Sequence, residues 1–448
     1  MRPQELCRIV LVLLSVLTTA LAALGQSPPS ANRDDSNGPT RWFKGNLHTH
    51  SLWSDGNDFP EMICEWYKKH GYQFLALSDH NILSRGTMWI DAGLPAKRGA
   101  KDGVERYTKR FGADWIQTRQ VDETSQIRLR ALDEFRSLFE QPGRFLLIQS
   151  EEITDRFQKL PVHINAGNLR DLIKPRGGAN VRAVMANNLD AIAQQSRDVG
   201  RPMLGHVNHP NFKWGITAED MAAVVQEQFF EVYNGHPGVR HRGDEHHPSV
   251  ERLWDIANTI RIAEMKRPPL SGLATDDAHN YFGQGGSSPG RGWVMVRATE
   301  LTPDGIIRAI QRNDFYASSG VTLRDVRYDA DLRVLRVEIE PEEGVEFTTE
   351  FVGTLENYDT STEPAGTDAE GKPIRATRRY SNDIGKVLAT VKGNSAVYRL
   401  TGRELYVRAV VTSTRPPENP VFDDQKQQAW TQPVGWERWV AAPQRDEN

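Results

Sequence analysis

Cysteine is almost absent from this chain of 448 residues, which has only Cys7 and Cys64. Cys7 falls within an apolar N-terminal segment, which leaves Cys64 as the one cysteine beyond it. No intramolecular disulfide can then form in the chain that follows this segment.

An excess of positive charge is also missing. Lys and Arg number 55 against 59 Asp and Glu, for a formal net charge of −4. Nucleic-acid binding calls for a basic face, so this balance gives no indication of it. Anionic small molecules are not excluded, because bound metal cations would dominate a local field. A hydrophobic share of 38% and a charged share of 25% fit a soluble globular protein, and the length favours two domains.

No apolar run reaches the roughly 20 residues of a membrane span. The longest, Ile9 to Ala23, follows Arg2 and Arg8 and ends among small residues. This three-part pattern predicts a secretory signal peptide over residues 1–25, with an uncleaved anchor as the alternative. Residues 26–40, rich in Ser, Pro, Asn and Asp, are predicted to be a disordered linker. We therefore expect export to the periplasm or the extracellular space, with no stable membrane span after cleavage.

The most informative stretch of the chain contains His48 and His50, which follow an apolar lead-in. Side chains two apart on a strand point the same way, so both imidazoles can reach one metal ion. Four later apolar runs also end in side chains able to bind metal. They are Phe74–His80, Phe145–Glu152, Pro202–His209 and Ser271–His279.

Such runs predict strands of a parallel sheet, and the helical segments between several of them indicate β/α units. Ligands at the C-terminal ends of parallel strands converge on one mouth, as in α/β barrels. Histidines and acids that merely follow strands in loops would explain one or two of these runs, but hardly five. Further predicted elements are helices at Pro60–His70, Asp122–Glu140, Val184–Ser196 and Thr302–Arg312 and a strand at Phe229–Asn234, with His236 beyond its end.

Residues 41–325 are predicted to form the first domain, and residues 326–448 a second, all-β domain. Polar and apolar residues alternate over Leu332–Ile339, and turn-rich stretches separate the strand-like segments. All 12 histidines lie before this region, so the chemistry is assigned to the first domain. An insertion over residues 81–121 is either a substrate loop or a surface excursion.

His, Asp and Glu without Cys suit Zn²⁺, Mn²⁺ or Fe²⁺. The number of candidate ligands exceeds what one ion needs, so two or three divalent ions are predicted. Such a cluster would lower the pKa of a bridging water and clamp the oxygens of a substrate, which favours hydrolysis.

The motifs resemble those of the polymerase-and-histidinol-phosphatase (PHP) superfamily over residues 43–283. Residues from Gly292 onward further resemble its secreted, carbaryl-hydrolase-like branch. The matching motifs are Asn46–His50 with Ser54–Gly56, Ser78–Asn81, Glu152–Thr154, His209-Pro210 and Asp277–His279. The resemblance implies an α/β fold, a distorted (β/α)7 barrel followed by a small C-terminal antiparallel β-sandwich.

The resemblance also implies how the ligands are shared among three ions. The sets are His48, His50, Glu152 and Asp277; Glu152, His163 and His209; and Asp55, His80 and His279. Asp55 stands where some family members have histidine. Glu151, Asp276 and His206 compete with their neighbours Glu152, Asp277 and His209 for these roles, and are otherwise expected to hydrogen-bond the ligands.

Arg291 is a candidate for gripping a substrate phosphate or carboxylate, with a solvated loop arginine as the alternative. The sequence thus predicts an exported hydrolase, foremost a phosphoesterase that uses a metal-bridging hydroxide. The alternatives are a carboxylic ester, amide or carbamate hydrolase with the same centre and a non-catalytic secreted binding protein. A small phosphoester or ester is the expected partner.

Overall fold

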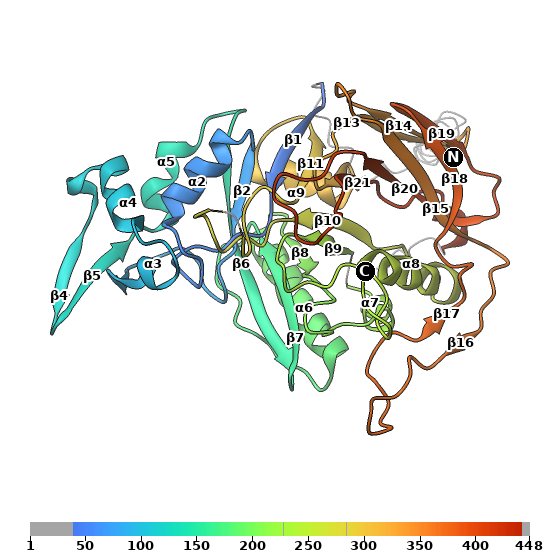
Figure 1. Ribbon diagram of the computed structural model, residues 1–448, viewed down its shortest axis with the longest axis horizontal. Coiled ribbons are helices and arrows are strands. Elements are labelled where there is room, and N and C mark those ends of the chain that lie inside the picture. Colours follow the sequence, from blue (N-terminus) through green and yellow to red (C-terminus); the bar gives the residue numbers. More distant parts are fainter. Residues whose placement is uncertain (1–38, 227, 284, 441–448) are drawn as a thin grey trace, which may run out of the picture. The chain divides into compact units, whose positions relative to one another are not determined.

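The computed structural model describes residues 39–440 except 227 and 284, and Figure 1 shows its course. The predicted signal peptide and nearly all of the predicted linker lie outside these residues. No helix within the described part of the chain is both long and apolar enough to cross a membrane. The described residues from Thr40 onward belong to one compact unit, and the boundary predicted at residues 325/326 stays a prediction.

The core is a mixed sheet whose strands run in the order β10-β9-β8-β7-β6-β2-β1-β11-β12-β21-β20-β15-β18. These strands are, along the chain, β1 Arg41–Asn46, β2 Phe74–Leu77, β6 Leu146–Phe157, β7 Leu160–Gly167, β8 Leu204–Val207, β9 Phe229–Asn234, β10 Ser271–Thr275, β11 Trp293–Ala298, β12 Phe315–Ser318, β15 Phe347–Leu355, β18 Lys386–Lys392, β20 Glu404–Ser413 and β21 Gln428–Trp430. Smaller sheets are β3 Met88–Asp91, β5 Thr124–Leu129 and β4 Thr118–Val121; β13 Leu323–Asp329, β14 Val334–Ile339 and β19 Ser395–Arg399; and β16 Thr362–Glu363 with β17 Arg379–Tyr380.

Parallel pairing brings the predicted strand ends together. β1 pairs with β2, β2 with β6, β8 with β9 and β9 with β10 in parallel. Of these strands, β2, β9 and β10 are buried along their whole length, as expected inside a parallel sheet. β7 is antiparallel to both β6 and β8. Beyond the ends of β1 and β10, Thr49 and Ala278 form a parallel bridge, and the His50 amide donates to the Ala278 carbonyl at 3.0 Å. The α/β class with a large mixed sheet is thus observed, and the closed (β/α)7 barrel stays a prediction.

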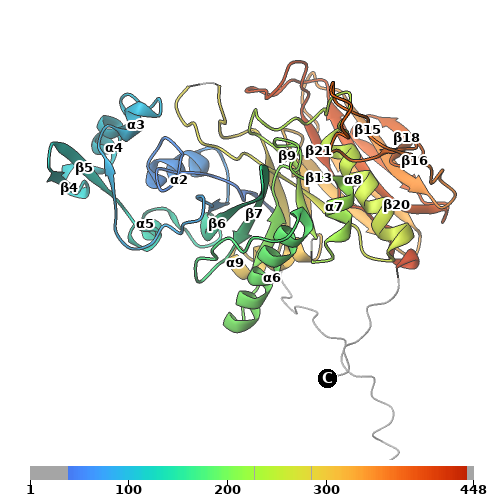
Figure 2. The same ribbon diagram turned by 90° about the horizontal axis from the view of Figure 1, so that it is seen from below.

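Helices cover this sheet, and three of the four predicted ones are confirmed. The helices are α2 Pro60–Lys69, α3 Leu94–Lys97, α4 Gly103–Phe111, α5 Leu132–Phe139, α6 Val181–Val199, α7 Ala218–Ala223, α8 Val250–Thr259 and α9 Pro303–Gln311, with short turns at Ala113–Trp115, Ile260–Glu264 and Glu437–Trp439. The side chain of Asn180 caps the first turn of α6, and Gly200 ends the helix with φ 72°. α6 packs along β6, β7 and β8 (Figure 2).

Two sequence predictions need correction. The helix predicted over Asp122–Glu140 is instead β5 followed by α5, because Ile127 and Leu129 are buried with strand alternation and Ala131 breaks the path with extended backbone. Glu152 does not end its strand either. β6 continues to Phe157 and turns at Gln158, with φ 56°, into β7.

The C-terminal strands form two antiparallel layers. β13, β14 and β19 lie over β15 and β20, and the layers share a core that includes Leu335, Val337, Phe351 and Val407. Tertiary contacts join this region to the β/α part through Arg408, whose guanidinium contacts Asp255 of α8 at 2.7 and 2.9 Å. The all-β character predicted for the end of the chain is therefore observed.

The insertion predicted over residues 81–121 contains β3, α3, α4 and β4, and β5 completes its small sheet. It docks onto α2 through the fully buried Glu61, whose Oε1 accepts hydrogen bonds from Tyr107 at 2.7 Å and Trp115 at 3.1 Å. The other carboxyl oxygen of Glu61 has no hydrogen-bond partner. Burial raises the pKa of Glu61 from its ordinary value of 4.5 to about 7.

This raised pKa predicts a pH-dependent docking energy. Because the folded state binds the Glu61 proton more tightly than the unfolded state, its stabilising effect is complete below pH 4.5 and is lost as the pH rises through 7. Glu61→Gln keeps a neutral acceptor at every pH. The free energy of unfolding of this variant minus that of the wild type should therefore increase by up to about 3 kcal/mol between pH 4.5 and pH 8. Urea denaturation measures the difference, with exposed Glu105→Gln as control, and a pH-independent difference would contradict the prediction.

Candidate metal centre

The strand ends place all nine predicted ligands in one cluster. His48 and His50 follow β1, His80 follows β2, His209 follows β8, and Asp277 and His279 follow β10. Glu152 lies within β6 and His163 opposite Thr154 on β7. Donor atoms lie within 4.8 Å of one another in three groups, which are His50, Asp55, His80 and His279; His48, His50 and Glu152; and Glu152, His163 and His209. The grouping resembles the division expected from the family resemblance, but His50 is added to the set of Asp55, and Asp277 is not part of the group of His48.

The innermost group has the spacing of ligands around a cation. The Nε2 atoms of His48 and His50 are 3.1 Å apart, and Asp277 Oδ1 lies 3.2 and 3.1 Å from them. Glu152 adds Oε1 at 3.6 Å from His48 and Oε2 at 3.4 Å from His50. Metal–ligand bonds of about 2.1 Å in a tetrahedron separate the ligands by roughly 3.4 Å. The donor set therefore fits a divalent ion.

The histidines of the cluster differ in their charge. Burial lowers the pKa of each ring, but neighbouring carboxylates outweigh it at His48, His80, His209 and His279 and raise their pKa values, so a bound cation would displace protons there. Burial, together with the neighbouring imidazole of His279, lowers the pKa of His50 to about 3, so the ring is neutral as a ligand must be. Burial opposes ionisation of Asp277 and Glu152, but the surrounding histidines outweigh it and hold both pKa values well below their ordinary range. Glu152 Oε2 is buried and has no hydrogen-bond partner. Ring nitrogens of His80 and His50 lie 2.7 and 3.4 Å from this oxygen, and a cation between them would compensate its buried charge.

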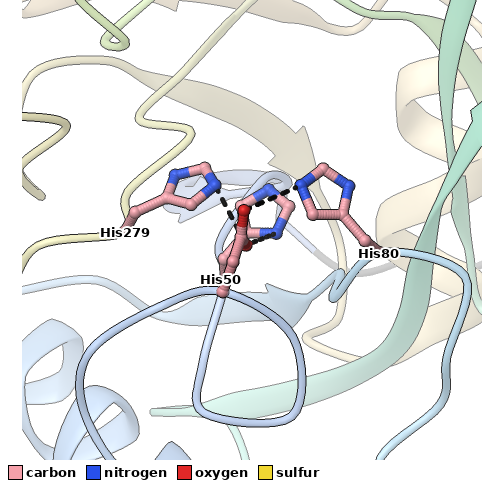
Figure 3. A group of neighbouring side chains, drawn as sticks. His50, His80 and His279 are labelled. Carbon is pink, nitrogen blue, oxygen red and sulfur yellow. Dashed lines mark ion pairs between the residues drawn. The ribbon is translucent and has the colours of Figure 1, made fainter. Parts of the chain in front are cut away.

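Figure 3 shows the outer group, in which the rings of His50, His80 and His279 point toward a shared centre. The carboxylate of Asp55 joins it, with oxygens 3.4 Å from His80 Nε2 and 3.3 Å from His279 Nε2. Asp55 is 52% exposed in its side chain, His80 26% and His279 21%, whereas His48 and His50 are fully buried. The cluster therefore opens to solvent on the side of Asp55.

Each competing neighbour points elsewhere. Glu151 Oε1 accepts a hydrogen bond from the Ile173 amide at 2.6 Å, and burial raises its pKa to about 8. Asp276 accepts hydrogen bonds from three consecutive backbone amides, Gly290 to Gly292. His206 is buried, with Nε2 3.6 Å from Glu231. The structure thus places Glu152, Asp277 and His209 in the cluster, and their role as ligands stays a prediction.

Backbone strain coincides with the cluster. His209 and Asp277 have φ values of 23° and 48°, a left-handed conformation that side chains other than glycine rarely adopt. The His209 amide donates to Glu231 Oε2 at 2.8 Å, and the Asp277 amide donates to the His48 carbonyl at 3.0 Å. Strained residues of this kind, held by their surroundings, gather at functional sites.

Glu231 on β9 is the main site residue that the sequence did not reveal. It is 1% exposed, and its Oε1 lies 2.6 Å from His48 Nδ1 and accepts from Thr275 at 2.7 Å. Burial opposes its ionisation, but His48 and His206 outweigh this and hold its pKa below the ordinary value. A carboxylate on the far nitrogen of a ligand histidine fixes the ring's orientation. The available signal was a charged residue inside the otherwise apolar run Phe229–Tyr233.

His236 lies at the rim, with its ring centre 5.7 Å from that of His279. The amide of Gly238 donates to its Nδ1 at 2.9 Å. A neutral His236 ring therefore carries its hydrogen on Nε2 and offers one N–H donor beside the cluster.

Arg291 occupies a different kind of position. Its guanidinium is buried and donates to the carbonyls of Gly235, Gly286 and Asn419 and to the side chain of Asn419. These hydrogen bonds hold three loops together. A role in gripping a substrate anion stays a prediction.

Comparisons of this chain with known proteins give only weak likenesses. No protein-family model matches the sequence, and no curated protein matches it. Among solved structures, the chain is similar to a two-domain protein containing a predicted PHP-like metal-dependent phosphoesterase from Bacteroides vulgatus, at 14% identity and TM-score 0.38, over 88% of this chain and 95% of that one. It is also similar to a candidate metal-dependent phosphoesterase from Bifidobacterium adolescentis, at 14% identity and TM-score 0.27, over 55% and 92%. Neither likeness carries weight at these TM-scores.

The contact between Glu231 and His48 leads to a testable expectation. Glu231→Gln keeps the size of the side chain but removes the charge that orients His48, so metal affinity should fall by about 10- to 100-fold. Competition with a chelator for Mn²⁺ or Zn²⁺ measures the Kd. Glu245→Gln, an exposed carboxylate of the following loop, is the matched control. An unchanged Kd in Glu231→Gln would rule out this orienting role.

Proposed function

We propose that this protein is a metal-dependent hydrolase that acts on phosphoesters. The observation that carries the proposal is the set of nitrogen and oxygen donors 3.1–3.6 Å apart around Glu152, His48, His50 and Asp277. The motif resemblance to PHP proteins supports the same class. The resemblance to their carbaryl-hydrolase-like branch supports the alternative, a carboxylic ester, amide or carbamate hydrolase with the same centre. Zn²⁺, Mn²⁺ or Fe²⁺ would suit these donors, and two or three ions would use all nine of them.

The candidate ligands would bind different metal ions according to their position in the cluster. His48, His50, Glu152 and Asp277 would hold the buried ion, and Glu152 would be shared with a second ion held by His163 and His209. Asp55, His80 and His279 would hold a third ion on the exposed side. Such ions, when bound, supply a water of lowered pKa and positive charge against phosphoryl oxygens.

The chain's own groups would orient the substrate. Because Asp55, His80 and His279 are the exposed members, the substrate would approach from their side, while the buried members exclude water from below. His236 Nε2–H stands at this rim as a hydrogen-bond donor for a substrate oxygen. Glu231 would keep His48 oriented throughout.

An exported location is also proposed, on the support of the N-terminal signal pattern alone. N-terminal sequencing of the protein recovered from outside the cytoplasm would test it. A mature N-terminus near residue 26 is expected, and a full-length cytoplasmic product would contradict it.

The test of the proposed activity is hydrolysis by the full chain with Mn²⁺, Zn²⁺ or Fe²⁺ added. His50→Ala and Asp277→Asn should each lower kcat/KM on p-nitrophenyl phosphate or bis(p-nitrophenyl) phosphate by at least about a hundredfold, because metal charge stabilisation is worth several kcal/mol. Circular dichroism should show a retained fold. His246→Ala, outside the cluster, is the control.

The substrate panel should include p-nitrophenyl acetate, an aryl amide and an aryl carbamate. Turnover of these instead of the phosphoesters would favour the carbonyl-hydrolase alternative. Full phosphoesterase activity in either variant would refute the metal-ligand assignment, and no turnover of any substrate would favour a binding protein.

A further inference from the structure

A cavity of about 570 Å³ lies directly beside the candidate metal centre. His163, one of the predicted ligands, lines its inner end together with Thr154, which contacts His80 at 2.5 Å. Arg156, Lys159 and Lys213 also line it. The cavity therefore begins at the metal centre and reaches basic side chains.

The hairpin of β6 and β7 explains how one surface connects these parts. Glu152, Thr154 and Arg156 alternate onto one face of β6. Across the hairpin they lie opposite Asn165, His163 and Pro161 respectively. Residues directly opposite each other in an antiparallel pair share a face. This face thus carries ligands Glu152 and His163 at its inner end, and Arg156 follows four residues further out, about 13 Å along the strand.

The three cations are available to a ligand. Within residues 39–440 as described, Arg156, Lys159 and Lys213 form no ion pair, and all three are exposed. The one carboxylate that lines the cavity, Asp155, already accepts hydrogen bonds from the amides of Arg156 and Gly177 and from Asn188. The cavity therefore has a surplus of positive charge, in a chain whose net charge is −4.

Phe212 forms an aromatic wall between this cavity and the centre. Its ring centre lies 5.0 Å from that of His209, 6.2 Å from His163 and 5.7 Å from His236. The ring is half-buried and also lines the cavity. A flat or apolar group between the reacting phosphate and the three cations would pack on it.

We propose that this cavity binds the leaving group of the substrate, and that this leaving group carries a second anion, a carboxylate or a phosphate, held by Arg156, Lys159 and Lys213. The inference rests on the proposed phosphoesterase function. It narrows the substrate class to phosphoesters with an anionic group about a dozen ångströms or less from the scissile phosphate. Guanidinium and ammonium groups bind both kinds of anion.

Matched substrates test the proposal on the full chain loaded with metal. Benzyl phosphate, 4-carboxybenzyl phosphate and the bisphosphate of 1,4-benzenedimethanol differ only in the second group, and a 4′-carboxybiphenylmethyl phosphate adds length. The methylene keeps the leaving-group chemistry nearly constant. The readout is the ratio of kcat/KM for each charged substrate to that for its uncharged parent. The carboxylate and bisphosphate substrates distinguish the two sources of anion.

The wild-type ratio should exceed one for at least one anion, and Arg156→Gln/Lys159→Gln/Lys213→Gln should lower it at least about tenfold. The charge-conserving variant Arg156→Lys/Lys159→Arg/Lys213→Arg should keep this ratio near the wild-type value. The control is Lys101→Gln/Lys174→Gln/Arg176→Gln, which removes the same charge from exposed positions outside the cavity and should keep the wild-type ratio.

Two results would overturn the inference while the proposed function stands. One is hydrolysis of benzyl phosphate with no preference for any anionic substrate, and the other is an equal loss of preference in the control variant. Failure to hydrolyse any of these phosphoesters would instead count against the proposed function itself.

Discussion

The carboxylate of Glu152 is 1% exposed and lies within 4 Å of a ring nitrogen of five histidines, which are His48, His50, His80, His163 and His209. Burying a charge is costly unless it is paired. Divalent cations between these groups would form bonds to the Glu152 carboxylate and to the ring nitrogens around it. The arrangement of the strand ends around Glu152 is therefore consistent with a scaffold that would keep the candidate ligands close together before a metal ion binds.

The buried and the exposed parts of this scaffold differ in rigidity and in access to solvent. The buried part is stiffened by Glu231, by the strained backbone of His209 and Asp277, and by the bridge between the ends of β1 and β10. The exposed part contains Asp55, His80 and His279, and beside it the β6–β7 hairpin leads toward solvent-exposed cations. Rigid candidate ligands in the buried part, and solvent access with nearby cations in the exposed part, suit a hydrolase that binds its substrate from the exposed side.

Much of the centre could be predicted because its ligands follow apolar strands in sequence. His48, His50, His80, His209, Asp277 and His279 all have this signal, and parallel pairing brings strand ends together whatever the details of packing. The role of Glu231 could not be predicted, because this residue lies in the middle of a strand and its contact with His48 depends on how distant strands pair. The β6–β7 hairpin was also missed, since the polar residues beyond Glu152 look like a loop until their pairing with His163 is known. The helix predicted at Asp122–Glu140 is wrong only in its first half, where β5 forms, because a strand can bury the same apolar residues.

Metal content with location tests the central claim most directly. The full chain, purified and saturated with Mn²⁺, should contain two or three ions. Anomalous diffraction at the manganese edge should place two of them within bonding distance of Glu152 and any third among Asp55, His80 and His279. Fewer than one ion per chain, or no anomalous peak at Glu152, would contradict the account.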